Sequence, residues 1–536
     1  MSAVDAIVIG SGPNGLVAAN LLADAGWEVL VLEAQDAPGG AVKSAEVTAT
    51  GFVSDLFSSF YPLAVGSSVL RDLHLEGHGL SWCHAPSVLA HPLLDGRTAL
   101  LSRDLATTSR SVAEFDSRDA AAWQGEVSRW QDLAPWLVQT LMTPFPPLRA
   151  GVGLARRLGV RDGLRFARFA TLSVRRFALE SFHGQGAALL LAGNALHTDL
   201  GPEAAGSAVF GWLLAMLGQT VGFPVPAGGA GALSAALVRR LQSAGGRVQC
   251  GSPVSQVLVR DGRAIGVRCG GETLRAGRAV LADVSAPALY LDLLDGGLVP
   301  ARLRGDLERF AWDDATVKVD WALSGPVPWT NTDVAGAGTV HLGGGLDDMS
   351  RFAHSLALGL LPAEPFLLFG QMTTADPSRS PAGTESAWAY THVPARPRGD
   401  SAGVLSGGWG EPTVRRGFLD RIEARVEQFA PGFRDLVMGR HIAFPADLEA
   451  ANANLVDGCL NGGTSDLYQQ LIFRPTPGLG RPETHIAGLF LASASAHPGG
   501  GVHGACGANA ARAAMRSRTS GRLALAATRA LAGPTQ

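Results

Sequence analysis

The chain has 536 residues, 46% of them hydrophobic, and a formal net charge of −3. This length predicts more than one structural unit, and the near-neutral charge gives no basic footprint for nucleic acid. The five cysteines are scattered and never form a Cys-x-x-Cys pair, so neither a metal site nor a disulfide framework is expected. The first residues lack the basic segment of a signal peptide, which favours a cytoplasmic location.

Residues 4–33 read as an apolar strand, a glycine turn, a helix and a second strand that ends in an acid. The turn has the pattern G-x-G-x-x-G, in which bare backbone approaches a pyrophosphate at the start of the helix. Glu33 follows at the distance where a carboxylate binds the hydroxyls of an adenosine ribose, and it disfavours a phosphorylated ribose. The unit therefore predicts an NAD or FAD site with contacts from Gly10, Gly12, Pro13, Asn14, Gly15, Glu33 and Ala34.

A second glycine pair, Gly39 and Gly40, follows this acid within seven residues and favours the longer FAD over NAD. The stretch E-x-x-x-x-P-G-G resembles the FAD fingerprint of the amine oxidase and phytoene desaturase superfamily. Many members carry an arginine after the pair; this chain has Ala41 at that cofactor-contacting position. The resemblance implies an α/β fold, with a discontinuous Rossmann-type FAD-binding domain and an inserted α+β substrate domain.

The segment 106–222 is rich in helical patterns. Its apolar run at 204–222 is interrupted by glycine and small polar residues, so it predicts a buried or cavity-lining helix rather than a membrane span. Between Leu148 and Phe182 the chain places eight arginines against two acids, interleaved with apolar residues. This pattern is typical of a basic amphipathic surface that rests on anionic lipid. A solvated helical face or a subunit contact explains it equally well.

Two later segments extend the resemblance. Residues 223–267 read as a glycine turn, an amphipathic helix and two strands, and the resemblance implies that the backbone at Val254 meets the adenine. The stretch SAHPGGGVHGACG, residues 495–507, places five glycines before an alanine-rich helix that is expected to begin near Val502. Bare backbone there can press against a flat ring, and a helix N-terminus favours negative charge on that ring. A purely structural loop is the alternative. The residues expected to hold the isoalloxazine are Gly500, Gly501 and Val502.

Few side chains are candidates for proton transfer. His497 and His503 flank the last glycine turn, where a histidine either faces the flavin or hydrogen-bonds the loop. Tyr61 lies in the segment that faces substrate in the resembled family, and a packed tyrosine with a satisfied hydroxyl is its alternative. Lys318 shares a strand face with Asp320 and is expected to be solvated or salt-bridged.

Within the superfamily the sequence is most similar to the phytoene-desaturase-like branch, which includes the pyridine nucleotide-disulfide oxidoreductase domain-containing proteins. The matching stretches are SGPNGLVAANLL, GGAVKSAEVTATGF, PAGGAGALSAAL, TTADPSRSPAG and AHPGGGVHGACGANAA. Despite the name of that branch, the chain lacks the paired cysteines of a disulfide reductase. The interleaving of these stretches predicts an FAD-binding domain from residues 1–105, 223–297 and 484–536, a helix-rich insertion facing substrate or membrane at 106–222, and a substrate-binding sheet with helices at 298–483.

The resemblance implies an FAD-dependent oxidoreductase that removes hydride from a largely apolar substrate, with isoprenoids or polyenes suggested by the family. Only one complete dinucleotide fingerprint is present. Electrons are therefore expected to pass to a diffusing acceptor such as dioxygen or a quinone, or to return to the substrate in an isomerisation. A flavin amine or alcohol oxidase is one alternative, and a non-catalytic flavoprotein that binds a membrane or protein partner is another.

Overall fold

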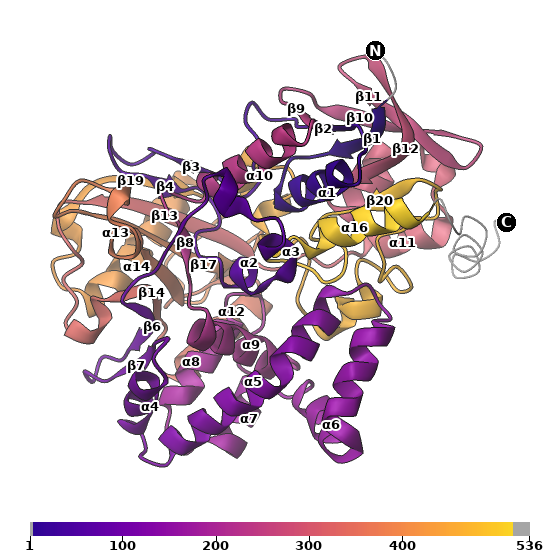
Figure 1. Ribbon diagram of the computed structural model, residues 1–536. Helices are drawn as coiled ribbons and strands as arrows, with labels where there is room; N and C mark the ends of the chain where they lie inside the picture. Colours follow the sequence, from indigo (N-terminus) through magenta and orange to yellow (C-terminus); the bar gives the residue numbers. More distant parts are fainter. Residues whose placement is uncertain (1–3, 518–536) are drawn as a thin grey trace.

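Two seven-stranded sheets and a group of helices beneath them organise the computed structural model, which describes residues 4–517 (Figure 1). One sheet lies with the N-terminus and the last helix. The other lies beside it and is formed largely by the second half of the chain.

The first sheet has the strand order β10-β11-β12-β1-β2-β9, with β20 pairing to β12. Its core is parallel, because β1 pairs in parallel with both β2 and β12, and β9 and β20 extend the two sides. Helices α1, α10 and α16 share one hydrophobic cluster on a face of this sheet. The bounds are β1 Val4–Ile9, α1 Pro13–Asp24, β2 Val29–Leu32, α10 Gly231–Ser243, β9 Arg247–Gln249, β10 Val254–Arg260, β11 Arg263–Cys269, β12 Glu272–Ala282, β20 Leu489–Leu491 and α16 Ala505–Arg516. This is a discontinuous Rossmann-type arrangement, as predicted.

The second sheet has the order β19-β13-β17-β16-β14-β6-β7. One face packs on α14 and the other faces α8 and α9, so all nine residues of β13 are buried. The predicted strand at 315–323 is present, and the predicted helix at 415–430 corresponds to α14. The bounds are β6 Ser87–Pro92, β7 Thr98–Leu101, β13 Ala315–Leu323, β14 Ala337–Leu342, β16 Leu367–Gln371, β17 Glu385–Val393, α14 Pro412–Phe429 and β19 Val437–Ala443.

The strands β6 and β7 belong to a different sheet from the one expected. They were expected in the nucleotide-binding unit as part of residues 1–105, but β6 pairs in parallel with β14 of the second sheet. The first segment of the nucleotide-binding unit therefore ends before Ser87. The local sequence of β6 and β7 does not indicate which sheet they join, because that depends on pairing with β14, which lies 250 residues further along the chain. At the other end, the predicted segment 484–536 is described only as far as residue 517.

Helices dominate the insertion between the two sheets and lie at the bottom of Figure 1. The apolar run at 204–222 forms α9, whose residues are largely buried and partly line a cavity, as predicted. Within residues 4–517, none of the helices combines the length and the hydropathy that a membrane crossing requires. The bounds are α4 Leu105–Ala113, α5 Asp119–Met142, α6 Leu148–Phe169, α7 Val174–Ser181, α8 Gly186–Ala195 and α9 Ser207–Thr220.

Candidate active site

A single large cavity of about 1070 Å³ is lined by residues of the first sheet, the second sheet and the helical insertion. It begins at the turn after β1 and reaches the end of α8 and the strand β17. All three catalytic candidates, Tyr61, His497 and His503, line it. Of the predicted cofactor contacts, those that line it are Gly10, Gly12, Pro13, Asn14, Glu33, Ala34, Gly40, Ala41, Val254, Gly500, Gly501 and Val502.

Two predicted contacts, Gly15 and Gly39, lie behind this lining. A side chain on Gly15 would overlap the carbonyl oxygen of Gly10, so this glycine lets α1 start close against the sheet. Gly39 has a φ of +125° and donates its backbone N–H to the carbonyl oxygen of Ser11 at 3.1 Å. Both glycines shape the loops whose neighbours reach the cavity.

Glu33 is held rigidly at the end of β2. Its Oε2 atom accepts hydrogen bonds from the backbone N–H of Ser11 at 2.9 Å and from the Ser11 hydroxyl. Its Oε1 atom accepts from the backbone N–H of Gln35 at 2.9 Å. The carboxylate is thereby fixed at the carboxyl edge of the parallel sheet, where a ribose is bound in dinucleotide folds.

Asp283, which the sequence interpretation missed, lies directly under the glycine turn. Its Oδ2 atom accepts the backbone N–H of Gly15 at 2.8 Å, and a Cβ on Gly12 would stand 2.7 Å from the same oxygen. Burial, reinforced by the charge of Glu33, raises the pKa of Asp283 to about 8. In the sequence, Asp283 is recognisable as an acid that directly follows the strand β12. Its role could not be predicted, because no local pattern shows that β12 pairs with β1.

The C-terminal loop presents Gly500, Gly501 and Val502 to the cavity, and α16 begins at Ala505, three residues later than expected. The Nδ1 atom of His503 accepts the backbone N–H of Ala505 at 3.0 Å, so its proton resides on Nε2. His497 lies with Nε2 3.0 Å from the carbonyl oxygen of Thr143, to which it must donate. Its Nδ1 atom, which is buried and has no hydrogen-bond partner among residues 4–517, is therefore left as the acceptor. Burial lowers the pKa of each histidine to about 4, so both are neutral near pH 7.

Tyr61 and Lys318 have partners within the protein. The Tyr61 hydroxyl donates to the carbonyl oxygen of Ser58 at 2.9 Å and lies 2.8 Å from the Ser58 hydroxyl. Burial, and then the charge of Asp55, raises the pKa of Tyr61 well above its ordinary value. Lys318 is buried in an ion pair with Asp320, so it is salt-bridged rather than solvated.

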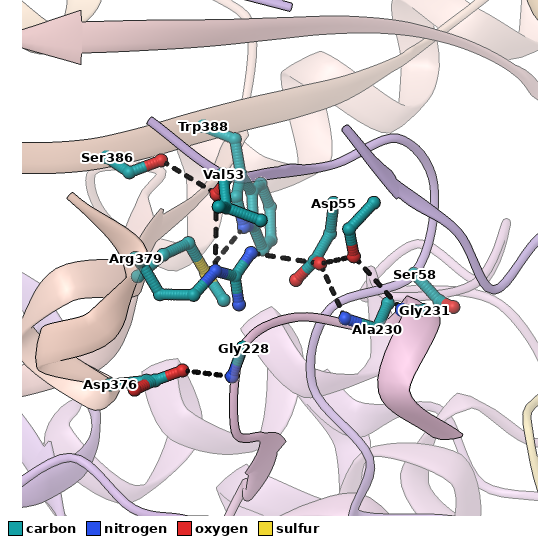
Figure 2. Close-up of polar contacts among 12 residues, drawn as sticks. Val53, Asp55, Ser58, Gly228, Ala230, Gly231, Asp376, Arg379, Ser386 and Trp388 are labelled. Carbon is teal, nitrogen blue, oxygen red and sulfur yellow. Dashed lines mark hydrogen bonds and ion pairs between the residues drawn. The ribbon is translucent and has the colours of Figure 1, made fainter. Parts of the chain in front are cut away.

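A fully buried ion pair joins the segment after β16 to the chain between β2 and β6. The guanidinium of Arg379 lies 2.9 Å from Oδ1 of Asp55, and its Nε donates to the carbonyl oxygen of Val53 at 3.2 Å (Figure 2). The same Asp55 oxygen accepts the backbone N–H of Ala230 at the start of α10. The pair therefore ties the loop after β16 to the glycine turn and helix of the nucleotide-binding unit.

These residues fit a bound FAD. The turns that contain Gly12 and Gly40, near the start of the chain, and Gly500, near its end, open on one cavity together with residues 252–254. The fixed carboxylate of Glu33 also lines this cavity. A Cβ on Gly12, Gly40 or Gly500 would overlap neighbouring protein atoms, so bare backbone at these positions lets the turns pack closely together around the cavity. Beyond these turns the cavity wall becomes apolar, with Phe210, Leu213 and Leu214 from α9.

Comparison with known proteins agrees with this geometry. The pattern of the family "Flavin containing amine oxidoreductase" matches residues 14–312, more than half of the chain. "Pyridine nucleotide-disulfide oxidoreductase domain-containing protein 2" of Rattus norvegicus is 27% identical, covering 96% of this chain and 93% of its own. "Hydroxyneurosporene desaturase" of Cereibacter sphaeroides is 28% identical, covering 92% and 94%.

Solved structures share the fold. An oxidoreductase from Methanosarcina mazei has a TM-score of 0.61 at 17% identity, covering 95% of this chain and 99% of its own. Putrescine oxidase bound to putrescine has a TM-score of 0.60 at 17% identity, covering 96% and 98%. The predicted resemblance is thus confirmed: the chain belongs to the flavin-containing amine oxidoreductase family and is an FAD-dependent oxidoreductase.

Proposed function

We propose that the protein removes a hydride from a largely apolar organic substrate, of isoprenoid or polyene type, and leaves a double bond. The observation that carries this proposal is the continuity of the cavity. The same space is lined by the turns that fit FAD and by the apolar side chains of α9. Bound FAD supplies a ring that accepts the hydride with its two electrons. These electrons then pass to a diffusing acceptor such as dioxygen or a quinone.

The second substrate hydrogen leaves as a proton, and His497 is the proposed acceptor. Its Nδ1 atom has no hydrogen-bond partner among residues 4–517, while its Nε2 atom is occupied by the carbonyl of Thr143. In the proposed role, His503 holds the glycine loop, because its Nδ1 atom accepts the backbone N–H of Ala505. Tyr61 would then shape the wall, because its hydroxyl is engaged by Ser58.

An apolar substrate is favoured over an amine by the aromatic side chains of the wall. Trp388 and Tyr390 line the cavity and stack on each other, with centroids 5.9 Å apart and planes 15° apart. They are alternate residues of one strand, so both rings project from the same face of the sheet. A cage for an ammonium group needs rings that surround the cation.

The cavity opens beside an exposed apolar surface, which supports contact with a membrane. Leu471, Ile472 and Phe473 line the cavity and are also about two-fifths exposed. Phe145, next to α6, is within reach of Ile472, since both approach Gly480. We propose a cytoplasmic protein that rests on anionic lipid through this rim and α6, and that draws its substrate from the bilayer.

The decisive experiment is an anaerobic absorption spectrum of the FAD-loaded protein before and after addition of lipophilic isoprenoids and polyenes. Bleaching of the flavin band with formation of a desaturated product supports the proposal. Bleaching by primary amines or alcohols alone would replace it with an oxidase function. A flavin that no organic compound bleaches would indicate a non-catalytic flavoprotein.

A further inference from the structure

The inner end of the cavity contains a histidine held by a second histidine. His197 follows α8, and its Nε2 atom lies 2.9 Å from Nε2 of His341 on β14. One of these nitrogens must carry the proton that the two share, so the pair fixes the orientation of the His197 ring. His197 lines the cavity, whereas His341 lies behind it.

The register of the second sheet brings Tyr390 to the same wall. His341 is opposite Leu368 on β16, and Leu368 is opposite Tyr390 on β17. Directly opposed residues of antiparallel strands point to the same face. Two strand spacings separate the backbones of His341 and Tyr390 by about 10 Å. His197, which lies against His341, therefore shares a wall with Tyr390.

Each of these two side chains has one hydrogen-bonding atom left over. Among residues 4–517, neither Nδ1 of His197 nor the hydroxyl of Tyr390 has a hydrogen-bond partner, and both side chains line the cavity. Their surroundings are apolar: the ring of Phe223 packs edge-on against His197, with centroids 6.2 Å apart. An unpaired polar atom in an apolar wall is costly unless a ligand or water pairs with it.

Both groups are neutral near pH 7. Burial lowers the pKa of His197 to about 3, and burial followed by the charge of Asp313 raises the pKa of Tyr390. The charged side chains nearest Tyr390 on the sheet already pair with each other, because Lys318, opposite Tyr390 on β13, is held in the ion pair with Asp320. His197 and Tyr390 themselves therefore offer no charge to a carboxylate or an ammonium ligand. A hydroxyl both donates and accepts, so it pairs with either tautomer of His197 and with Tyr390.

We propose that His197 and Tyr390 form a binding site for one neutral hydroxyl group on an otherwise apolar substrate, so that the substrate class is an apolar alcohol. This inference rests on the proposed function, because it takes the cavity to be the substrate site. The hydroxyl binds at the wall formed by His197 and Tyr390 and fixes which part of the apolar chain lies toward the flavin-binding turns.

The test uses limonene and perillyl alcohol, which differ by a single hydroxyl. Their dissociation constants are measured by calorimetry on the FAD-loaded protein without oxygen, for the wild type, His197→Phe and Tyr390→Phe. The quantity compared is the ratio of the limonene constant to the alcohol constant. We expect each substitution to lower this ratio about fivefold to tenfold, because only the alcohol loses a hydrogen bond.

Tyr290→Phe is the matched control, because Tyr290 is buried in the nucleotide-binding unit and does not line the cavity. Its ratio should equal that of the wild type. Tyr390→Phe leaves the pair of His197 and His341 intact, so it tests the site even if His197→Phe does not fold. Ratios within twofold of the wild type in both variants, or no binding of either compound to the wild type, would overturn the inference. Failure of the proposed function has a different signature, namely a flavin that isoprenoids do not bleach.

Discussion

The Oδ2 atom of Asp283 accepts a hydrogen bond of 2.8 Å from the backbone N–H of Gly15, in the first turn of the helix that points at the pyrophosphate site. A carboxyl group thus occupies the positive end of a helix dipole that a phosphate would also use. The two negative groups are compatible only if Asp283 keeps its proton. Its pKa of about 8, raised by burial and by Glu33, meets this condition near pH 7.

FAD affinity should therefore weaken at high pH. Above pH 8 the carboxyl group of Asp283 loses its proton in the FAD-free protein. FAD binding must then take up a proton, because a charged carboxylate would repel the phosphates. The dissociation constant of FAD should therefore rise about tenfold between pH 7 and pH 9. Asp283→Asn keeps the shape and stays neutral, and its constant should be flat over this range. Titration of flavin fluorescence measures both. Equal slopes for the two proteins would show that Asp283 is not the titrating group.

The same shift has a consequence for stability. The unfolded carboxyl releases its proton near pH 3.8, but the native one holds it to about pH 8. The free energy of unfolding should therefore fall as the pH rises between these values, relative to Asp283→Asn. Urea unfolding of the FAD-free proteins at pH 5 and pH 8 measures the difference. A wild type that gains stability relative to the variant over this interval would contradict the assignment.

The ion pair of Arg379 and Asp55 should contribute strongly to the stability of the fold, because it ties the segment after β16 to the start of α10. Both side chains are fully buried, so Arg379→Met leaves a carboxylate buried without its cation. The expected loss is about 3–5 kcal/mol in the free energy of unfolding. Arg396→Met is the matched control, because Arg396 is 86% exposed in its pair with Asp457 and should cost less than about 1 kcal/mol. Denaturant unfolding followed by flavin release compares them, and equal losses would refute a special role for the buried pair.

The parts of the fold and of the site that could be predicted from the sequence are those whose contacting residues lie close together along the chain. The glycine turn, Glu33 and Gly40 lie within 31 residues of one another, so their spacing alone predicted the FAD-binding edge. Asp283 contacts Gly15 across 268 residues, through the pairing of β12 with β1 that no local pattern indicates. His197 and His341 meet across 144 residues for the same reason, and each alone reads as an ordinary core histidine.

Proton acceptance by His497 predicts a distinct pH profile. Because burial lowers its pKa to about 4, Nδ1 is free to accept a proton above that pH and is blocked below it. The rate of anaerobic flavin bleaching should rise through pH 4 and then level off, while His497→Gln should be about 100-fold slower. His503→Gln should change the rate much less. Stopped-flow absorbance with a bleaching isoprenoid measures the rates, and unchanged bleaching in His497→Gln would assign the proton to water.

Membrane contact should depend on the outer side of α6. Val160 and Leu164 are 84% and 70% exposed there, while Leu154 and Phe166 line the cavity, so this helix is apolar on two sides. Several arginines of the 148–182 segment form ion pairs, for example Arg168 with Glu180. Three arginines of α6 have no ion-pair or hydrogen-bond partner within the described part of the chain: Arg149, Arg156 and Arg161.

Replacing these three arginines with glutamine should weaken binding to vesicles that contain phosphatidylserine by about 100-fold, since each contributes about 1 kcal/mol near an anionic surface. Rising salt should weaken the wild type in the same direction. The control variant replaces Arg260, Arg268 and Arg275 with glutamine. This removes the same amount of charge from the strands β10 to β12, at the opposite end of the molecule (Figure 1). Vesicle flotation measures the bound fraction. If both triple variants bind equally, net charge rather than α6 governs adsorption; if the wild type does not bind at any salt concentration, the arginine-rich helix is a solvated face or a subunit contact.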